Sequence, residues 1–352
     1  MMDIFPIMRE HDHEQLLFCH EPSTGYRGLI AIHNTTLGPA LGGTRYWKYD
    51  TEADAVIDAL RLARGMSYKA AVAGLALGGG KSVILADGKG TDREALFRAH
   101  GRFVETLKGR YITAEDVGTS PADMEYIHLE TTHVVGLQGR SGDPSPVTAH
   151  GVYRGMKASA GWKFGNDSLA GRTVAVQGCG HVGYYLCQYL ADEGAKLVVT
   201  DIAPEKAQRV VEEFRAKAVQ PEEIYRVEAD VFAPCALGAV VNDRTLAQFT
   251  VKVIAGGANN VLAEPRHGDE LEKKGILYAP DYVINAGGLM NVNGELEGWS
   301  AERALRKAGE IYDTMLRVFE LAKEEGLPTY RAADRLAERR IAMAAKLKRT
   351  WV

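Results

Sequence analysis

The segment that most restricts the fold is a short apolar run that leads directly into a glycine-rich turn. Thr173–Gln177 reads Thr-Val-Ala-Val-Gln and has the length and composition of a buried strand. Residues 178–183 (Gly-Cys-Gly-His-Val-Gly) follow without a gap, and Leu186 and Leu190 then recur at helical spacing. Glycines here permit a tight turn in which backbone N–H groups can approach a bound anion. The segment therefore predicts a strand, a phosphate-binding turn and a helix in succession.

An acidic residue stands where such a unit recognises ribose. Asp201 ends the next apolar run, Lys196–Thr200, about twenty residues beyond the glycines. A carboxylate there accepts hydrogen bonds from ribose hydroxyls, and its charge repels a 2′-phosphate, which favours NAD over NADP. The alternative is a glycine turn that binds no ligand. We expect the cofactor to be bound by Gly178, Gly180, His181, Val182, Gly183 and Asp201.

Strand-like and helix-like segments alternate through the second half of the chain. Further short β-like runs lie at 251–254, 277–278 and 282–284, and this alternation predicts a doubly wound parallel sheet. The length of 352 residues suggests two domains, with a linker at 139–146, where glycine, proline and serine gather. From about Ala301 the chain is helical and charged, and we expect it to pack back on the first domain.

The first half mixes strands and helices. A helix over 52–64 opens with Thr51 and Asp54 as a capping box, and we expect Gly65 to end it. Another helix opens at Thr91 with Glu94, one at Ser120-Pro121, and a long one after the linker ends near Gly161. The strands of this half are predicted at 28–33, 81–85 and 111–113.

Composition and charge exclude several kinds of partner. The net charge of −4 offers no basic face for nucleic acid. The four cysteines form no C-x-x-C pair, so we expect reduced, buried thiols and no metal site. The N-terminus lacks the features of a signal peptide, and no apolar run is long enough to span a membrane. We therefore expect a cytoplasmic protein.

Three segments of the first half concentrate residues that carry chemistry. They are Leu41–Arg45, then Lys69 with Gly78–Lys81, then Ala114–Gly118. A lysine after three glycines can point into a cleft, because glycines let a ligand or backbone come close. A single lysine is more often a solvated surface charge, and an aspartate such as Asp116 is more often a turn or cap residue. These residues alone do not establish a catalytic site.

Four motifs together resemble those of the glutamate/leucine/phenylalanine/valine dehydrogenase family, in order and over essentially the whole chain. They are Leu37–Arg45, Gly78–Lys81, Thr113–Thr119 and Asn285–Gly288. The resemblance implies an α/β protein with an N-terminal substrate-binding and oligomerisation domain, a Rossmann domain, and C-terminal helices that return to the first domain. The domains would comprise residues 1–140 with 330–352, and residues 141–329.

The resemblance also implies roles for individual residues. Lys69 matches a lysine that binds the substrate α-carboxylate, and Gly42 and Gly43 line the same pocket. Lys81 matches a lysine that activates a water, and Asp116 matches an aspartate that exchanges protons with the amino group. Thr148 and Asn260 match residues near the nicotinamide, Asn260 at the junction of cofactor and substrate.

The implied reaction is the reversible, NAD-dependent deamination of an amino acid to a 2-oxo acid and ammonia. A free lysine has a pKa near ~10.4 and is a poor base at neutral pH. Burial and a second nearby cation would lower the pKa of Lys81, and our hypothesis is that Lys69 and the positive nicotinamide supply that charge. Lys81→Ala should then abolish turnover while NAD binding survives.

The pocket residues favour an aliphatic substrate. Glutamate-specific members of the family have lysine and serine where Leu41 and Val292 stand here, so a substrate carboxylate would be unpaired at a cost of several kcal/mol. Leucine, isoleucine and valine fit, whereas phenylalanine depends on a volume that the sequence does not give. A glycine at Gly294, where leucine-specific members usually have aspartate, leaves the preference open. The expected side-chain pocket comprises Leu41, Met66, Ala114, Leu289 and Val292.

The sequence also bears on two other functions and on the assembly of the protein. A non-catalytic NAD-binding regulatory module would have lost Lys69, Lys81 or Asp116, and all three are present. A 2-hydroxy-acid dehydrogenase would need a histidine–carboxylate pair in a cleft motif, and none is found in the sequence. The resemblance implies a homo-oligomer, with an octamer of two stacked tetramers as the expected form.

Overall fold

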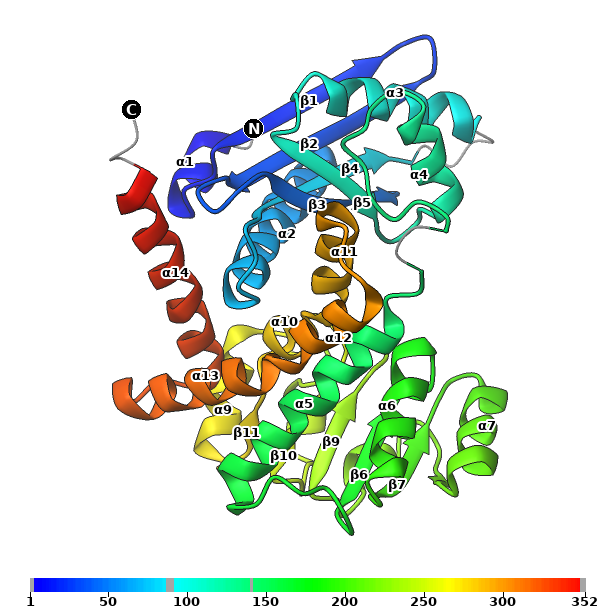
Figure 1. The fold of residues 1–352 in the computed structure, drawn as a ribbon, viewed down its shortest axis with the longest axis vertical. Helices are drawn as coiled ribbons and strands as arrows, with labels where there is room; N and C mark the ends of the chain where they lie inside the picture. The colour runs from blue at the N-terminus through cyan, green and yellow to red at the C-terminus, as the bar shows by residue number, and fades with distance from the viewer. Residues whose placement is uncertain (1–2, 87–91, 140–141, 349–352) are drawn as a thin grey trace. The chain divides into compact units, whose positions relative to one another are not determined.

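The computed structural model describes residues 3–86, 92–139 and 142–348, and the chain divides into two compact units (Figure 1). Unit 1 comprises Met1–Gly142, Glu295–Gly298 and Ala337–Val352, and unit 2 comprises Asp143–Gly294 and Trp299–Leu336. The division predicted from the sequence differs at residues 141–142, 295–298 and 330–336. Among the described residues, no helix has the length and apolar character required to cross a membrane.

Unit 1 is built around a mixed five-stranded sheet in the order β1-β2-β4-β3-β5. β1 pairs with β2 and β2 with β4 in antiparallel fashion, while β3 lies parallel to both β4 and β5. The elements of this unit that precede the linker are α1 (Ile4–Glu10), β1 (Gln15–Glu21), β2 (Tyr26–Asn34), β3 (Ala40–Trp47), α2 (Glu52–Val72), β4 (Gly78–Leu85), α3 (Arg93–Glu105), β5 (Tyr111–Glu115) and α4 (Pro121–His128). The strands predicted at 28–33, 81–85 and 111–113 are confirmed within β2, β4 and β5.

Both faces of this sheet are covered, which explains the uninterrupted apolar run in β2. Leu29 and Ala31 pack with buried residues of α2, whereas Ile30 and Ile32 pack with those of α3 and α4. Successive side chains of a strand point to opposite faces, so a strand buried on both sides is apolar at every position. Helix α2 therefore lies on one face of the sheet and α3 and α4 on the other (Figure 1).

Helix α2 begins as predicted but continues further. Thr51 and Asp54 form the predicted capping box. The predicted end at Gly65 is wrong, because the helix runs to Val72 and its continuation buries residues such as Ala70. An exposed glycine costs about 1 kcal/mol in a helix, which this burial offsets. The helix ends at Val72, and Gly74, the residue after its C-cap Ala73, adopts a left-handed φ of 72°.

Two other boundaries in this half are set by flanking residues. Ser120 and Asp123 form a capping box for α4 with Pro121 at the first turn, as predicted. Asp92 caps α3 through the N–H of Ala95, whereas the predicted start at Thr91 lies outside the described residues. Residues 140–141 of the predicted linker also lie outside them.

Unit 2 contains a parallel six-stranded sheet in the order β11-β10-β9-β6-β7-β8. The order reverses beside β6, which confirms the predicted doubly wound fold. Its elements up to the last strand are α5 (Ser145–Phe164), β6 (Thr173–Gln177), α6 (His181–Asp192), β7 (Lys196–Thr200), α7 (Pro204–Phe214), β8 (Lys217–Ala218), a 3-10 turn (Ile224–Arg226), β9 (Val231–Pro234), α8 (Asp243–Leu246), β10 (Val253–Ile254), α9 (Pro265–Lys273) and β11 (Leu277–Tyr278).

The chain after the last strand is helical. Its helices are α10 (Asp281–Ile284), α11 (Gly287–Glu297), α12 (Ala301–Gly309), α13 (Ile311–Glu325) and α14 (Thr329–Lys348). The predicted strand at 282–284 is therefore wrong, and its apolar character comes from burial of Val283 and Ile284. Short apolar runs do not distinguish a strand from a buried helical turn. Helix α14 passes from unit 2 into unit 1 at Ala337, so the last helical residues do belong to the first unit.

Candidate active site

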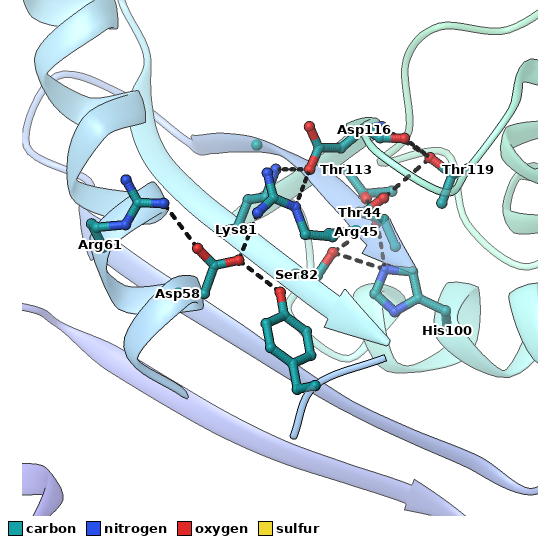
Figure 2. Close-up of polar contacts among 12 residues, drawn as sticks. Thr44, Arg45, Asp58, Arg61, Lys81, Ser82, His100, Thr113, Asp116 and Thr119 are labelled. Carbon is teal, nitrogen blue, oxygen red and sulfur yellow. Dashed lines mark hydrogen bonds and ion pairs between the residues drawn. The ribbon is translucent and has the colours of Figure 1, made fainter. Parts of the chain in front are cut away.

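The candidate catalytic pair lies in unit 1, where β4 and β5 flank β3. Lys81 belongs to β4, and Asp116 directly follows β5. Nζ of Lys81 donates a hydrogen bond of 2.6 Å to Oδ2 of Asp116 (Figure 2). Lys81 is only 5% exposed, so the ion pair is largely removed from water. The structure thus brings together the two residues for which the resemblance implies proton transfer.

The surroundings of this pair favour a lysine that loses its proton readily. Burial lowers the pKa of Lys81, the nearby Asp116 carboxylate opposes that change, and the Arg45 guanidinium adds to it. Burial opposes ionisation of Asp116, but Lys81 and Arg45 outweigh it and lower the pKa of the Asp116 carboxyl. Arg45 is therefore a cation that acts on Lys81 in this structure. The hypothesis that Lys69 and the nicotinamide add further positive charge stays a prediction.

Arg45 connects the catalytic pair to a second carboxylate. Its Nε donates to Oδ2 of Asp116 at 2.9 Å, and its Nη1 donates to Oδ2 of Asp58 at 2.6 Å (Figure 2). Tyr49 donates to the same Asp58 oxygen at 2.6 Å, and Arg61 donates to Oδ1 at 3.0 Å. The site is therefore a network of alternating charges that extends from β5 to α2.

Two glycines are required by the close packing around the pair. A Cβ at Gly43 would lie 2.7 Å from Cβ of Asp116, so a side chain there would displace the aspartate. A Cβ at Gly79 would lie 2.0 Å from the backbone nitrogen of Ser67, so the glycine lets α2 pack directly on β4. These glycines set the distances between the elements that carry Lys69, Lys81 and Asp116.

The remaining predicted substrate residues of unit 1 lie on α2, β3 and β5. Lys69 and Met66 are half-buried and one helical turn apart on α2, so they share a face of the helix. Gly42 and the buried Leu41 belong to β3, and the half-buried Ala114 of β5 pairs with Gly43. Leu41 is 2% exposed and contributes to the core of the unit as well.

The predicted phosphate-binding turn connects β6 to α6 in unit 2. Gly178 has a φ of 98°, which a residue with a side chain rarely adopts. Gly180 is the N-cap of α6, and His181 is the first residue of that helix, with its side chain 85% exposed. A Cβ at Gly183 would lie 2.0 Å from the carbonyl oxygen of Gly178, and Val182 packs against Gly257. The N-terminus of α6 therefore presents backbone N–H groups with little steric obstruction.

Asp201 occupies the predicted place after β7 and also orders the turn. Its Oδ2 accepts a hydrogen bond of 2.7 Å from the N–H of Cys179, and its Oδ1 accepts one of 2.9 Å from the N–H of Ala203. Each carboxylate oxygen has a further lone pair for a ligand hydroxyl. Asp201 thus both shapes the glycine turn and remains able to bind ribose.

A cavity of about 170 Å³ adjoins this aspartate. Oε1 of Gln177 and Oγ1 of Thr200 are buried without hydrogen-bond partners among the described residues, and both residues line the cavity. Ile202 and Leu237 are 89% and 83% exposed although apolar, and they also line it. Unpaired polar atoms beside exposed apolar side chains fit the adenosine half of a dinucleotide, which offers hydroxyls and an apolar ring.

The other predicted residues of unit 2 lie on α5, on the loop after β10 and on α11. Thr148 donates to the carbonyl of Pro144 at 2.9 Å, and Asn260 is exposed with a left-handed φ of 52°. Leu289 and Val292 lie three residues apart on α11, on one face of the helix. Oδ1 of Asn285 is buried without a hydrogen-bond partner in the described part of the chain.

Several residues that complete these sites were not recognised from the sequence. Arg45 belongs to the motif Leu37–Arg45, but no role was predicted for it, and Asp58 and Tyr49 lie outside the four motifs. Gln177 and Thr200 are the last residues of two parallel strands, and that position at the carboxyl ends of strands could have indicated them. In the described ranges, no group of three or more metal-ligating side chains is arranged to hold an ion.

Comparison with known proteins covers the chain almost from end to end. Residues 13–133 match the family model of the Glu/Leu/Phe/Val dehydrogenase dimerisation domain, and residues 199–349 match that of glutamate/leucine/phenylalanine/valine dehydrogenase. The chain is 59% identical to leucine dehydrogenase from Geobacillus stearothermophilus over 99% of this chain and 95% of that protein.

Solved structures agree with these matches. The crystal structure of L-tryptophan dehydrogenase from Nostoc punctiforme superposes with a TM-score of 0.89 at 48% identity, covering 97% of this chain and 99% of that one. That of the hetero-hexameric glutamate dehydrogenase from Thermus thermophilus, in its leucine-bound form, superposes with a TM-score of 0.77 at 25% identity, covering 96% and 90%.

Proposed function

Because this chain belongs to the glutamate/leucine/phenylalanine/valine dehydrogenase family, we propose that it catalyses the reversible NAD-dependent deamination of branched-chain L-amino acids, leucine first. The products of the forward reaction are the 2-oxo acid, ammonia and NADH. The observation that carries the proposal is the buried ion pair of Lys81 and Asp116, in a chain 59% identical to a leucine dehydrogenase. A desolvated lysine with a specific charge partner is typical of catalytic sites, which favours an enzyme over a non-catalytic binding module.

Asp116 is the group that we assign to the substrate amine. Its Oδ2 is occupied by Lys81 and Arg45, at 2.6 and 2.9 Å. Within the parts of the chain that the structure describes, no N–H or O–H group donates to its Oδ1. An ionised carboxylate with one engaged oxygen can accept a proton from the substrate ammonium on the other.

Lys81 is the group that we assign to water activation. Burial lowers the pKa of Lys81, so the neutral amine becomes accessible closer to neutral pH. A neutral amine can remove a proton from water as the water attacks the iminium carbon of the oxidised substrate. The same amine, once protonated, can return a proton when ammonia leaves.

The substrate would be held by the charged and apolar residues that the sequence indicated. We assign the α-carboxylate to Lys69, with Gly42 and Gly43 lining the same pocket, and the side chain to Leu41, Met66, Ala114, Leu289 and Val292. An aliphatic side chain gains about 0.8 kcal/mol for each CH₂ that it buries in such surroundings. A carboxylate side chain would lose hydration without gaining a cation.

NAD fits the residues of unit 2. When bound, it supplies the chemistry that removes a hydride from the substrate Cα. We assign its phosphates to the turn formed by Gly178, Gly180, His181, Val182 and Gly183, its ribose to Asp201, and its nicotinamide side to Thr148 and Asn260. The cavity beside Asp201, with the unpaired oxygens of Gln177 and Thr200, supports this placement of the adenosine half.

The direct test is an assay of the purified protein for NADH formation with a panel of L-amino acids. We expect leucine, isoleucine and valine to be oxidised with NAD, and glutamate to be inactive. The similarity to an L-tryptophan dehydrogenase structure makes aromatic substrates the main rival, so phenylalanine and tryptophan belong in the panel. A higher kcat/KM for phenylalanine or tryptophan than for leucine would overturn the substrate assignment.

We also propose that the protein is a homo-oligomer, with the octamer as the expected form, and that it works in the cytoplasm. Support for assembly comes from the match of residues 13–133 to a dimerisation domain. Support for a reducing compartment comes from the four cysteines, all of which are free thiols. Light scattering coupled to gel filtration would measure the molar mass in solution, and a dimer or monomer would contradict the octamer.

A further inference from the structure

Two cations share a single oxygen of Asp116. Lys81 and Arg45 both donate to Oδ2, and the backbone of the aspartate is fixed independently. Its N–H donates to Oγ1 of Thr119 at 2.9 Å, and that hydroxyl lies within hydrogen-bond distance of two carbonyl oxygens, that of Asp116 at 2.8 Å and that of Thr44 at 3.1 Å (Figure 2). With the backbone and Oδ2 both held, the direction of Oδ1 is determined.

Arg45 can hold Oδ2 in this way because its other arm is anchored. Its side chain is 20% exposed and uses two different nitrogens to reach Asp116 and Asp58. Asp58 is in turn held by Tyr49 and Arg61. A guanidinium offers several donors in a rigid plane, so Arg45 reaches the two carboxylates with two separate nitrogens, whereas a lysine would have to reach both with its single nitrogen.

The bridge connects elements that carry different parts of the proposed site. Arg45 belongs to β3, Asp58 belongs to α2, and Asp116 follows β5. Helix α2 also carries Lys69, to which we assign the substrate carboxylate. Arg45 therefore fixes the position of Asp116 relative to helix α2, which carries the lysine assigned to the substrate α-carboxylate.

We propose that Arg45 is a positioning residue for the deamination, which orients Asp116 so that Lys81 meets one carboxylate oxygen and the substrate amine meets the other. This inference rests on the proposed function. Arg45 does not touch the reacting atoms and acts through Asp116. Asp58 is its partner in the network and keeps the guanidinium in place.

The charges around Lys81 allow this role to be separated from a merely structural one. The charged and titratable groups of the described residues that act on the pair include Arg45 from β3, Asp58 from α2, and Tyr111 and Glu115 from β5. Besides burial, Arg45 lowers the pKa of Lys81, whereas Asp58 raises it. Removing Arg45 and removing the charge of Asp58 should therefore move the pH dependence of turnover in opposite directions.

The experiment compares the pH profiles of kcat for leucine oxidation in wild type and four variants. Arg45→Gln should reduce kcat by about tenfold or more and move the acidic limb to higher pH by roughly one unit. Asp58→Asn should move that limb to lower pH. Arg45→Lys should keep the limb near its wild-type position but lower kcat about tenfold, because a flexible ammonium lacks the rigid fork with which Arg45 orients Asp116.

Arg98→Gln is the matched control. Arg98 lies on α3 and forms an ion pair of 2.7 Å with Glu130 away from the site, so its loss should leave kcat and the limb unchanged. Thermal unfolding of each variant reports whether it is folded, and Arg45→Lys decides the question if Arg45→Gln does not fold.

The possible outcomes separate the two proposals. An inactive wild type would overturn the proposed function and this inference with it. An active wild type with Arg45→Gln or Arg45→Lys indistinguishable from Arg98→Gln would overturn the inference alone. Shifts of the acidic limb in the same direction for Arg45→Gln and Asp58→Asn would overturn it too. Opposite shifts with a lowered kcat in Arg45→Lys would support it.

Discussion

The hydroxyl of Tyr68 donates a hydrogen bond of 2.9 Å to Oε1 of Glu338, which joins the residue before Lys69 to the C-terminal helix. Helix α14 reaches the same end of α2 with a second side chain. Arg340 donates to the carbonyl of Ala71 at 2.6 Å and to that of Leu75 at 2.9 Å. The carbonyls at the end of a helix otherwise lack partners, and a cation also complements the helix dipole there. The final helix therefore stabilises the part of α2 that carries Lys69.

Arg340→Gln should impair substrate binding more than chemistry. Loss of a charged donor to helix-terminal carbonyls costs roughly 1.5–3 kcal/mol of stability and loosens the last turn of α2. We expect the KM for leucine to rise at least ~3-fold, as Lys69 loses its fixed position, while kcat changes little. Steady-state kinetics and thermal unfolding test this. Lys346→Gln, an exposed change on the same helix, is the control, and equal KM values in the two variants would refute the prediction.

Lys81→Ala should abolish turnover while NAD binding survives. Removal of a general base costs about 10²–10⁴-fold in rate, and Asp116 keeps Arg45 as a partner, so the site should remain folded. NAD affinity should not change, since the phosphate-binding turn belongs to unit 2. The measurements are NADH formation with leucine and a fluorescence titration with NAD. Turnover within ~10-fold of wild type would reject Lys81 as the base.

Asp201→Asn should weaken the discrimination against NADP. The substitution removes the negative charge that repels a 2′-phosphate, and the amide oxygen can still accept one of the two backbone hydrogen bonds made by Asp201. We expect the ratio of kcat/KM for NAD over NADP to fall by about tenfold, or roughly 1.4 kcal/mol. Asp192→Asn, an exposed change on α6, should leave that ratio unaltered. A ratio that stays constant in Asp201→Asn would show that other residues exclude NADP.

The nucleotide-binding unit could be predicted closely because its signals are local. Thr173–Gln177 and Lys196–Thr200 are strands with the predicted limits, and the glycines and Asp201 follow them directly in the chain. Apolar runs bounded by glycine or aspartate carry this information over a few residues. The hydrogen bond from the N–H of Cys179 to Asp201, which orders the turn, also lies within this one strand–helix–strand unit.

The charge network around Asp116 could not be predicted in the same way. β3 was not predicted as a strand, because its two glycines and its polar residues have no strand pattern of their own. The segment is a strand because it pairs with both β4 and β5. Arg45 meets a carboxylate 13 positions away on α2 and another 71 positions away after β5. Such contacts depend on how the sheet and α2 pack, and no local pattern encodes them.

The buried histidines predict a loss of stability in mild acid. Burial lowers the pKa of His33 to about 4 and that of His100 to about 3, and it also lowers the pKa of His13 and His150. In the unfolded chain these groups return to a pKa near ~6.5. Between these values the unfolded chain binds more protons than the folded one, so stability rises with pH in that window. The free energy of unfolding should therefore reach its full value above about pH 6.5 and decrease as the pH drops toward about 4.

Urea unfolding between neutral pH and pH 5 measures this loss before most carboxylates begin to protonate. Each buried histidine should change the free energy of unfolding by up to ~1.4 kcal/mol per pH unit. His100 is the one to test, and in the folded protein its ring forms a hydrogen bond of 2.8 Å with the hydroxyl of Tyr26. His100→Gln should be less stable at neutral pH, because the network around Thr44 and Ser82 loses a partner, yet its midpoint should fall less steeply with pH. His20→Gln, an exposed change on β1, should keep the wild-type slope. A urea midpoint that does not change with pH in the wild type would mean that these histidines are already solvated in the native protein, and would contradict the prediction.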